Sequence, residues 1–180
     1  MQRVMIIGGP GSGKTTLALE LGERTGLPVF HMDQIHHLPG WVERDREEKG
    51  RLCSEVHARE RWIFEGNHSA AYPERVARAD TCIWLDLPVS LRLARVVWRT
   101  LRHYGQDRPS LPENCPERFS REFFAFIWRT RNTTRVRPLA IKADPPPHLT
   151  FVHITSVAEL RRYLASLNLT VCAALAQTSG

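Results

Sequence analysis

The chain has 180 residues, of which 42% are hydrophobic and 24% charged, and its formal net charge is +6. This length suits one domain with a sizeable core, the composition argues against a disordered chain, and the apolar runs fall short of the ~20 residues of a membrane helix. The positive charge, carried by 22 Arg against 3 Lys, suits an anionic partner such as a nucleotide or a nucleic acid.

The first predicted element is a short buried strand over residues 4–7, followed by a phosphate-loop motif that opens a helix. The motif G-x-x-x-x-G-K-[ST] is spelled by Gly8, Gly9, Pro10, Gly11, Ser12, Gly13, Lys14 and Thr15, with Thr16 next to it. In such loops the backbone N–H groups cradle phosphates, the lysine reaches the β- and γ-phosphates, and the hydroxyl holds Mg²⁺. The motif therefore predicts ATP and Mg²⁺ as cofactors.

A second strand is predicted over residues 29–32, and Asp33 follows it directly. Ligands bind at the carboxyl ends of parallel strands, so Asp33 could accept a proton from a substrate hydroxyl or hold a metal-bound water. The alternative is a turn or cap carboxylate. The nearby His31, His36 and His37 do not predict zinc, because no cysteine joins them. Residues 33–60, with a helix over 43–60, form the predicted substrate-binding insertion.

Strands are also predicted over residues 62–65 and 82–87, and each carries an acidic residue at or near its carboxyl end. Glu65 and Asp86 both fit the pattern of an apolar strand followed by an acid that contacts Mg²⁺, in phosphate-loop proteins often through water. We favour Glu65, because in kinase-type topology the third strand lies beside the phosphate-loop strand. Asp86 stays open as the alternative.

The next predicted helix, over residues 89–103, carries a stripe of arginines. Arg92, Arg95, Arg99 and Arg102 share one helix face, and a forked guanidinium can neutralise the charge that develops on a transferred phosphoryl group. The alternatives are a solvated face and a nucleic-acid patch. Residues 99–116, rich in turn formers, are predicted to form a lid that contains Arg108.

The remaining chain contains a helix that Pro116 is expected to open, a strand over residues 150–154 and a last helix with a capping box from Ser156 to Glu159. We expect one domain over 1–169 and a tail over 170–180. Because the four cysteines form no C-x-x-C pair and the first strand begins within four residues, we expect a cytoplasmic protein without a signal peptide. Strands alternating with helices predict a doubly wound α/β fold.

The chain resembles the adenylate-kinase-like and shikimate-kinase-like branch of phosphate-loop kinases, and more narrowly a bacterial group called DNA topology modulation proteins. The resemblance rests on residues 8–14, 39–42, 62–67, 84–88, 108–109 and 115–117. It implies a three-layer P-loop NTPase sandwich with a five-stranded parallel sheet, and it makes phosphate-handling candidates of Lys14, Arg99, Arg102, Arg108, Arg129 and Arg131. The sequence departs from adenylate kinases at Glu65-Gly66-Asn67-His68-Ser69, which lacks the arginine that grips the monophosphate.

These features lead to one favoured hypothesis and two alternatives. We favour a kinase that moves the γ-phosphoryl group of Mg·ATP to a small acceptor, either a nucleotide or a hydroxyl metabolite, with Asp33 at the acceptor. The first alternative is an ATP-binding protein associated with nucleic acid, although the chain contains no recognised DNA-reading module. The second is a regulatory nucleotide binder with little turnover.

Overall fold

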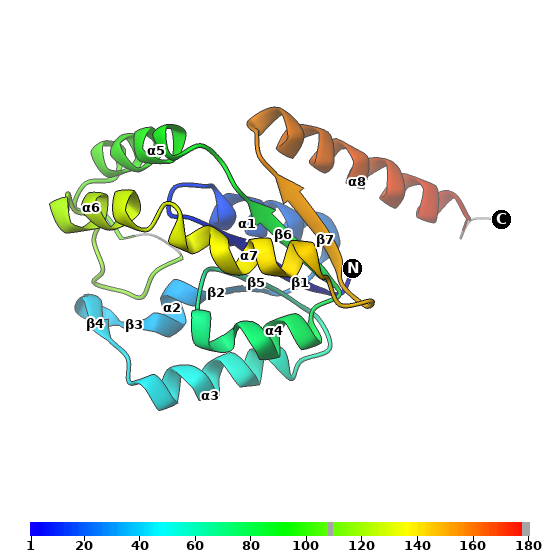
Figure 1. Ribbon diagram of the computed structural model, residues 1–180, viewed down its shortest axis with the longest axis horizontal. Helices are drawn as coiled ribbons and strands as arrows, with labels where there is room; N and C mark the ends of the chain where they lie inside the picture. Colours follow the sequence, from blue (N-terminus) through cyan, green and yellow to red (C-terminus); the bar gives the residue numbers. More distant parts are fainter. Residues whose placement is uncertain (108–109, 178–180) are drawn as a thin grey trace.

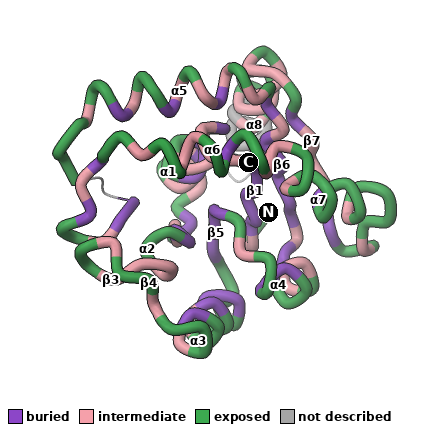
Figure 2. The backbone as a smooth tube through the Cα atoms, turned by 60° about the vertical axis from the view of Figure 1, so that its left-hand side comes forward, coloured by how far each residue is buried: buried purple, intermediate pink, exposed green. Residues whose placement is uncertain are grey.

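A parallel β-sheet forms the middle layer of the computed structural model, which describes residues 1–107 and 110–177, with the backbone alone for 168–177. Its strands are β1 (Arg3–Gly8), β2 (Val29–His31), β5 (Trp62–Glu65), β6 (Thr81–Leu85) and β7 (Thr150–Ile154). Their order across the sheet is β2-β5-β1-β6-β7, and every neighbouring pair is parallel (Figure 1). The three central strands are largely buried along their length (Figure 2).

Helices cover both faces of this sheet, and the pleat of β1 assigns its side chains to them alternately. Val4 and Ile6 lie in one apolar core with residues of α1 (Lys14–Thr25) and α8 (Val157–Gln177). Met5 and Ile7 lie in a second core on the opposite face. The helices of that face are α3 (Arg46–His57), α4 (Tyr72–Arg78) and α7 (Thr133–Ala143). The expected three-layer fold with a five-stranded parallel sheet is confirmed.

Residues 33–60 fold into most of a short helix, a small hairpin and a longer helix beside the β2 edge (Figure 1). Strand β2 ends one residue earlier than expected, because Met32 already begins α2 (Met32–His36). A small hairpin follows, made of β3 (His37–Leu38), a 3-10 turn (Pro39–Trp41) and β4 (Val42–Glu43). The Asp45 carboxylate then caps α3 by accepting from the N–H groups of Glu47 and Glu48 at 2.8 and 3.3 Å.

Two helices, α5 (Val89–Arg102) and α6 (Arg121–Arg129), lie beside each other beyond the carboxyl ends of the strands (Figure 1). The expectation that Pro116 opens a helix is wrong. The segment around it is extended, since the N–H of Gly105 donates to the Glu117 carbonyl at 2.9 Å. Helix α6 begins only at Arg121, where the Ser120 hydroxyl accepts from the N–H of Phe123 at 3.1 Å. A local side-chain cap therefore sets the helix start.

The β3–β4 hairpin is joined to the segment that leads into α6. The Trp41 N–H donates to Cys115 Sγ at 3.2 Å, and its indole N–H donates to the Pro116 carbonyl at 3.3 Å. Cys115 in turn donates to the Leu38 carbonyl at 3.7 Å. Trp41 takes the left-handed backbone conformation, with a φ of 63°, to make these contacts. We call residues 38–41 and 115–116 the clasp.

The carboxyl-terminal part of the chain begins with a capped helix. The Ser156 hydroxyl accepts from the Glu159 N–H at 3.2 Å, and the Glu159 carboxylate accepts from the N–H of Thr155 at 2.7 Å. Helix α8 runs through Gln177, so the tail expected from residue 170 continues this helix as far as the description reaches.

Among the described residues, no helix combines the length and apolar character needed to span a bilayer.

Candidate active site

The loop between β1 and α1 presents the amino end of a helix to a cleft. Gly13 caps α1 in the left-handed conformation, with a φ of 92°. Gly11 also has a positive φ of 78°, and a Cβ there would lie 2.3 Å from the Arg92 carbonyl oxygen. Glycine at residue 11 is thus required both by backbone conformation and by close approach. The free N–H groups and dipole at the start of α1 favour an anion at this place.

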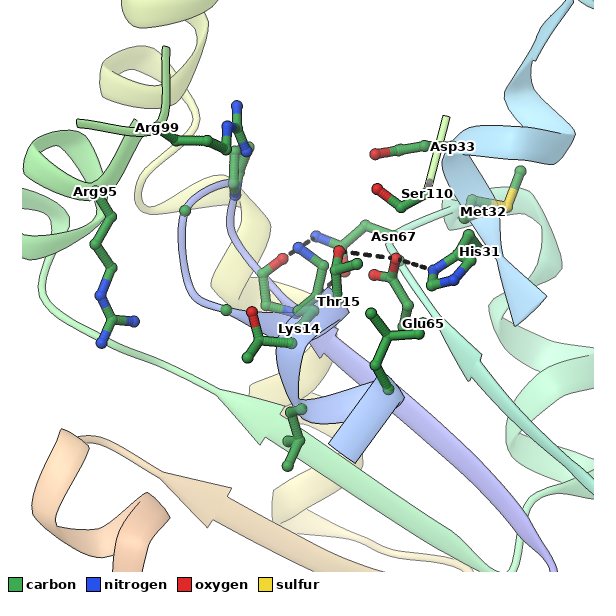
Figure 3. A pocket seen from close by; sticks show the side chains of 18 of the residues that line it. Lys14, Thr15, His31, Met32, Asp33, Glu65, Asn67, Arg95, Arg99 and Ser110 are labelled. Carbon is green, nitrogen blue, oxygen red and sulfur yellow. Dashed lines mark hydrogen bonds and ion pairs between the residues drawn. The ribbon is translucent and has the colours of Figure 1, made fainter. Parts of the chain in front are cut away.

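Thr15 and Glu65 meet beside this helix end (Figure 3). The Thr15 hydroxyl donates to Glu65 Oε1 at 3.1 Å, and His31 Nδ1 lies 2.9 Å from the same oxygen. A carboxylate only accepts, so the His31 ring carries its proton on Nδ1. The Lys14 ammonium donates to the Gly9 carbonyl at 3.3 Å. These residues come from α1, β2 and β5, which converge at the carboxyl edge of the sheet.

Glu65 is 3% exposed and remains ionised at neutral pH. Burial by itself raises the pKa of Glu65. The hydrogen bond from His31, the charge of Lys14 and the bond from Thr15 act in the opposite direction and hold this pKa below its ordinary value. A buried carboxylate and a threonine hydroxyl are hard oxygen groups of the kind that bind Mg²⁺, directly or through its waters.

Asn67 fastens the end of β5 to the start of the phosphate loop. Its side-chain amide donates to the Gly8 carbonyl at 2.9 Å, while its Oδ1 accepts from the Gly8 N–H at 3.3 Å. The Tyr72 hydroxyl also donates to Asn67 Oδ1 at 3.3 Å. Asn67 lies in one of the matching stretches of the sequence, but its role is not visible there, because both of its bonds to Gly8 depend on β5 lying beside β1.

A cleft of about 1000 Å³ surrounds these groups. Figure 3 shows Arg95 and Arg99 on one side of the phosphate loop, with Asp33 and Ser110 on the other. Asp33 is exposed in α2 and its carboxylate makes no hydrogen bond within the described part of the chain. The residues lining the cleft also include most of the predicted phosphate-binding segment, namely Gly8, Pro10, Gly11, Gly13, Lys14, Thr15 and Thr16.

The arginine stripe of α5 divides between structural and cleft-facing positions. Arg92 is buried behind the phosphate loop, where its Nε donates to the Leu87 carbonyl at 3.2 Å. Arg95 donates to the Ser12 carbonyl at 3.2 Å. Arg99 lines the cleft and pairs with Glu117 at 3.1 Å, and the exposed Arg102 also lines the cleft. Three of the four arginines therefore face the site.

Two other predicted phosphate-handling arginines, Arg129 and Arg131, are not gathered in the cleft. Arg131 donates to the Trp128 carbonyl at 2.7 Å and lies 4.5 Å from the centre of the Trp128 ring. Arg129 is exposed at the end of α6, and neither residue lines the cleft in the described structure. Arg108 lies outside the described residues.

Asp86, the alternative to Glu65, lies apart from the Thr15 hydroxyl. Its carboxylate pairs with Arg135 at 2.8 Å and with His153 Nε2 at 3.2 Å. Its own backbone N–H donates to the Ile154 carbonyl at 2.8 Å, toward β7. Asp86 is not among the residues that line the cleft.

Comparison with solved structures identifies the class of fold. Shikimate kinase from Acinetobacter baumannii in complex with shikimate superposes with a TM-score of 0.55 at 15% identity, covering 96% of this chain and 94% of that one. A shikimate kinase from Bacteroides thetaiotaomicron gives a TM-score of 0.51 at 15% identity, covering 94% of this chain and 98% of that one. A gluconokinase from Sinorhizobium meliloti gives 0.50 at 15% identity, covering 94% and 97%. The chain has the fold of the P-loop kinases.

Comparison of the sequences alone also finds a similar protein. A cytidylate kinase from Methanoregula boonei is 32% identical over 111 residues, which cover 54% of this chain. The chain spans only 60% of the length of that relative. No protein-family model matches the chain.

Proposed function

We propose that the chain is a phosphotransferase that moves the γ-phosphoryl group of Mg·ATP to a small acceptor, a nucleotide or a hydroxyl metabolite. The observation that carries the proposal is the meeting of Thr15 and Glu65 at 3.1 Å beside the amino end of α1, with Lys14 adjacent. The similarity to a cytidylate kinase supports phosphoryl transfer as the reaction. In this proposal residues 1–169 form the kinase domain, 33–60 the acceptor insertion and 99–116 the lid.

The donor side of the cleft supplies the groups that hold a polyphosphate. The loop N–H groups and the Lys14 ammonium would bind the phosphates, and Thr15 and Glu65 would hold Mg²⁺. When bound, Mg²⁺ neutralises charge on the phosphate oxygens. Arg95, Arg99 and Arg102 from α5 would face the negative charge that develops during transfer.

The acceptor side supplies a carboxylate. Asp33 faces the cleft across from the arginines, where it can orient an acceptor hydroxyl and accept its proton. For a phosphate acceptor, which needs no base, Asp33 would instead orient the molecule. Closure of the lid over both substrates would exclude water and favour transfer over hydrolysis. Roles for Arg129 and Arg131 would require movement of α6 and α7.

The test is acceptor-dependent release of ADP from Mg·ATP, with nucleoside monophosphates (cytidine nucleotides first), nucleosides and hydroxy acids as acceptors. We expect stimulation by one class. A flat response across the panel would contradict the proposal, and duplex binding that weakens steeply with salt would favour the alternative of a nucleic-acid-associated protein.

A Lys14→Ala variant tests whether the phosphate loop carries the activity. We expect its turnover to fall by about 10²–10³, the cost of removing one preorganised charge from a transfer site. Its thermal unfolding should stay close to wild type, because within the described part of the chain the Lys14 ammonium hydrogen-bonds only the Gly9 carbonyl of its own loop. Global unfolding of this variant would mean that Lys14 is structural.

A further inference from the structure

Arg75 carries a charge at the centre of the face opposite α1. It lies in α4 and is 0% exposed. Burial lowers the pKa of Arg75, but a guanidinium starts from so high a value that it remains protonated. Throughout residues 1–107 and 110–177, no carboxylate lies at ion-pair distance from it. A buried charge without such a partner is costly, so its remaining contacts carry the compensation.

Those contacts join separate segments directly beneath the cleft. Arg75 Nη1 donates to the Gly66 carbonyl at 2.7 Å, and the guanidinium lies 3.9 Å from the centre of the Phe64 ring. Nη2 lies 3.9 Å from Met32 Sδ, in the helix that carries Asp33. Arg75 thus contacts both the carboxyl end of β5 and the start of α2.

Gly66 is the residue through which Arg75 can act on the site. It lies between Glu65, which bonds Thr15, and Asn67, which bonds Gly8 on both of its backbone groups. Gly66 has a φ of 113°, and a Cβ there would lie 2.4 Å from Met32 Cβ. A carbonyl held in this conformation fixes the directions in which its two neighbours leave the turn.

His57 orients Arg75 from the far side. Its ring is fully buried, and burial, with the charge of Arg75 and of Arg78 acting in the same direction, lowers the pKa of His57 in spite of Glu74. The neutral ring accepts from Arg75 Nε at 3.3 Å through Nε2, so its proton is on Nδ1, 3.2 Å from Glu74 Oε2. The chain of contacts therefore runs from α3 and α4 to the end of β5.

We propose that Arg75, oriented by His57, is a positioning residue for the phosphate-loop site. By holding the Gly66 carbonyl it keeps Glu65 beside Thr15 and Asn67 beside Gly8, and it touches neither substrate nor metal. The role rests on the proposed function, since it is defined by the groups that would hold Mg·nucleotide.

The test compares Arg75→Met with Arg78→Met. Methionine fills a similar buried space without charge and removes the donors to the Gly66 carbonyl and to His57 Nε2. Arg78 is a matched control, because it lies in the same helix and donates to the His57 carbonyl at 3.0 Å without reaching Gly66. The measurement is calorimetric binding of ADP with and without Mg²⁺, together with kcat and KM and the thermal midpoint.

We expect Arg75→Met to remain folded. The factor by which Mg²⁺ raises the affinity for ADP should be about tenfold smaller in this variant than in wild type, and kcat should fall to a similar extent. Arg78→Met should stay within about twofold of wild type in both. A folded Arg75→Met protein with an unchanged Mg²⁺ effect and unchanged kcat would overturn the proposal.

If Arg75→Met does not fold, a comparison of His57→Leu with His57→Gln tests the positioning role instead. Glutamine restores an acceptor for Arg75 Nε, so it should recover the Mg²⁺ effect that leucine loses; equal behaviour of the two would overturn the proposal. Nucleotide binding by the wild-type protein distinguishes a failure of the proposed function from a failure of the positioning role. If wild type binds no nucleotide, the proposed function fails, whereas wild-type binding matched by folded Arg75→Met contradicts only the positioning role.

Discussion

The carboxyl ends of β5 and β6 look alike in sequence but differ in the structure. Both strands pair with β1, one on each side, and both are apolar runs with an acid at the end. Glu65 is directed to α1 and bonds Thr15, whereas Asp86 is directed to α7 and pairs with Arg135. The same local pattern therefore produces a candidate metal ligand at one strand and a structural ion pair at the next.

The strand pleat explains the difference. Glu65 is two residues after Ile63, which lies in the core beneath α1, so both side chains point to that face. Asp86 is two residues after Trp84, which lies in the opposite core with α7. His153, stacked on Trp84 at 4.2 Å between ring centres, donates from Nε2 to the Asp86 carboxylate there. The face of the sheet to which an acidic residue points, set by the alternation of side chains along its strand, is thus more informative than its position at the strand end.

The largest effect that tests this comparison is on turnover. We expect Glu65→Gln to lower kcat/KM by on the order of 10²-fold, about 3 kcal/mol, because the amide removes the charge beside Thr15. Asp86→Asn should leave kcat/KM within about twofold, since Asp86 contacts neither the loop nor the cleft. Steady-state assays of the two variants measure the contrast, and equal losses would contradict the assignment of Glu65.

The next effect concerns the stability of the Asp86 variant. Asp86→Asn weakens contacts with Arg135 and His153, of which the Arg135 side chain is 48% exposed. Because solvent screens that pair, we expect a loss of about 1 kcal/mol. Urea unfolding measures the loss directly, and a decrease of roughly 2–4 °C in Tm should accompany it. Undiminished stability would mean that the Asp86 contacts contribute nothing to the fold.

The smallest effect concerns pH. Because folding lowers the pKa of Glu65 from its ordinary 4.5, the unfolded chain binds more protons between the two values. The stability from this carboxylate is complete above 4.5 and is lost as pH falls through the folded pKa. Glu65→Gln cannot titrate, so between about pH 6 and about pH 3.5 it should lose less stability than wild type. Urea titrations at both pH values test this, with an identical loss as the contrary result.

The sequence was sufficient where the signal is local. The phosphate loop is a contiguous motif, and the strands of the main sheet are continuous apolar runs, so the fold class and the positions of those five strands could be predicted to within a residue or two, whereas the short strands β3 and β4 were not predicted. The preference for Glu65 over Asp86 as the acid beside Thr15 also came from topology, though its metal role stays a prediction.

The sequence was insufficient where side chains meet across long separations. The spacing of the α5 arginines predicted a shared face but not that Arg92 would be buried behind the loop. Pro116 was misread because the extended pairing around Glu117 is a tertiary contact. Arg75 gave no signal, since a lone arginine in a short helix looks like any solvated one. Its role depends on Gly66 and His57, which are 9 and 18 residues away.

The clasp has a mechanical consequence for any opening of the cleft. The hairpin that follows α2 and the stretch that leads into α6 hold each other through Trp41, at 3.2 and 3.3 Å. Separating these two segments breaks the indole hydrogen bond, which is worth about 0.5–1.5 kcal/mol, so moving them together costs less free energy than moving either one alone. We therefore expect the β3–β4 hairpin and the stretch that leads into α6 to move as one body whenever either of them moves.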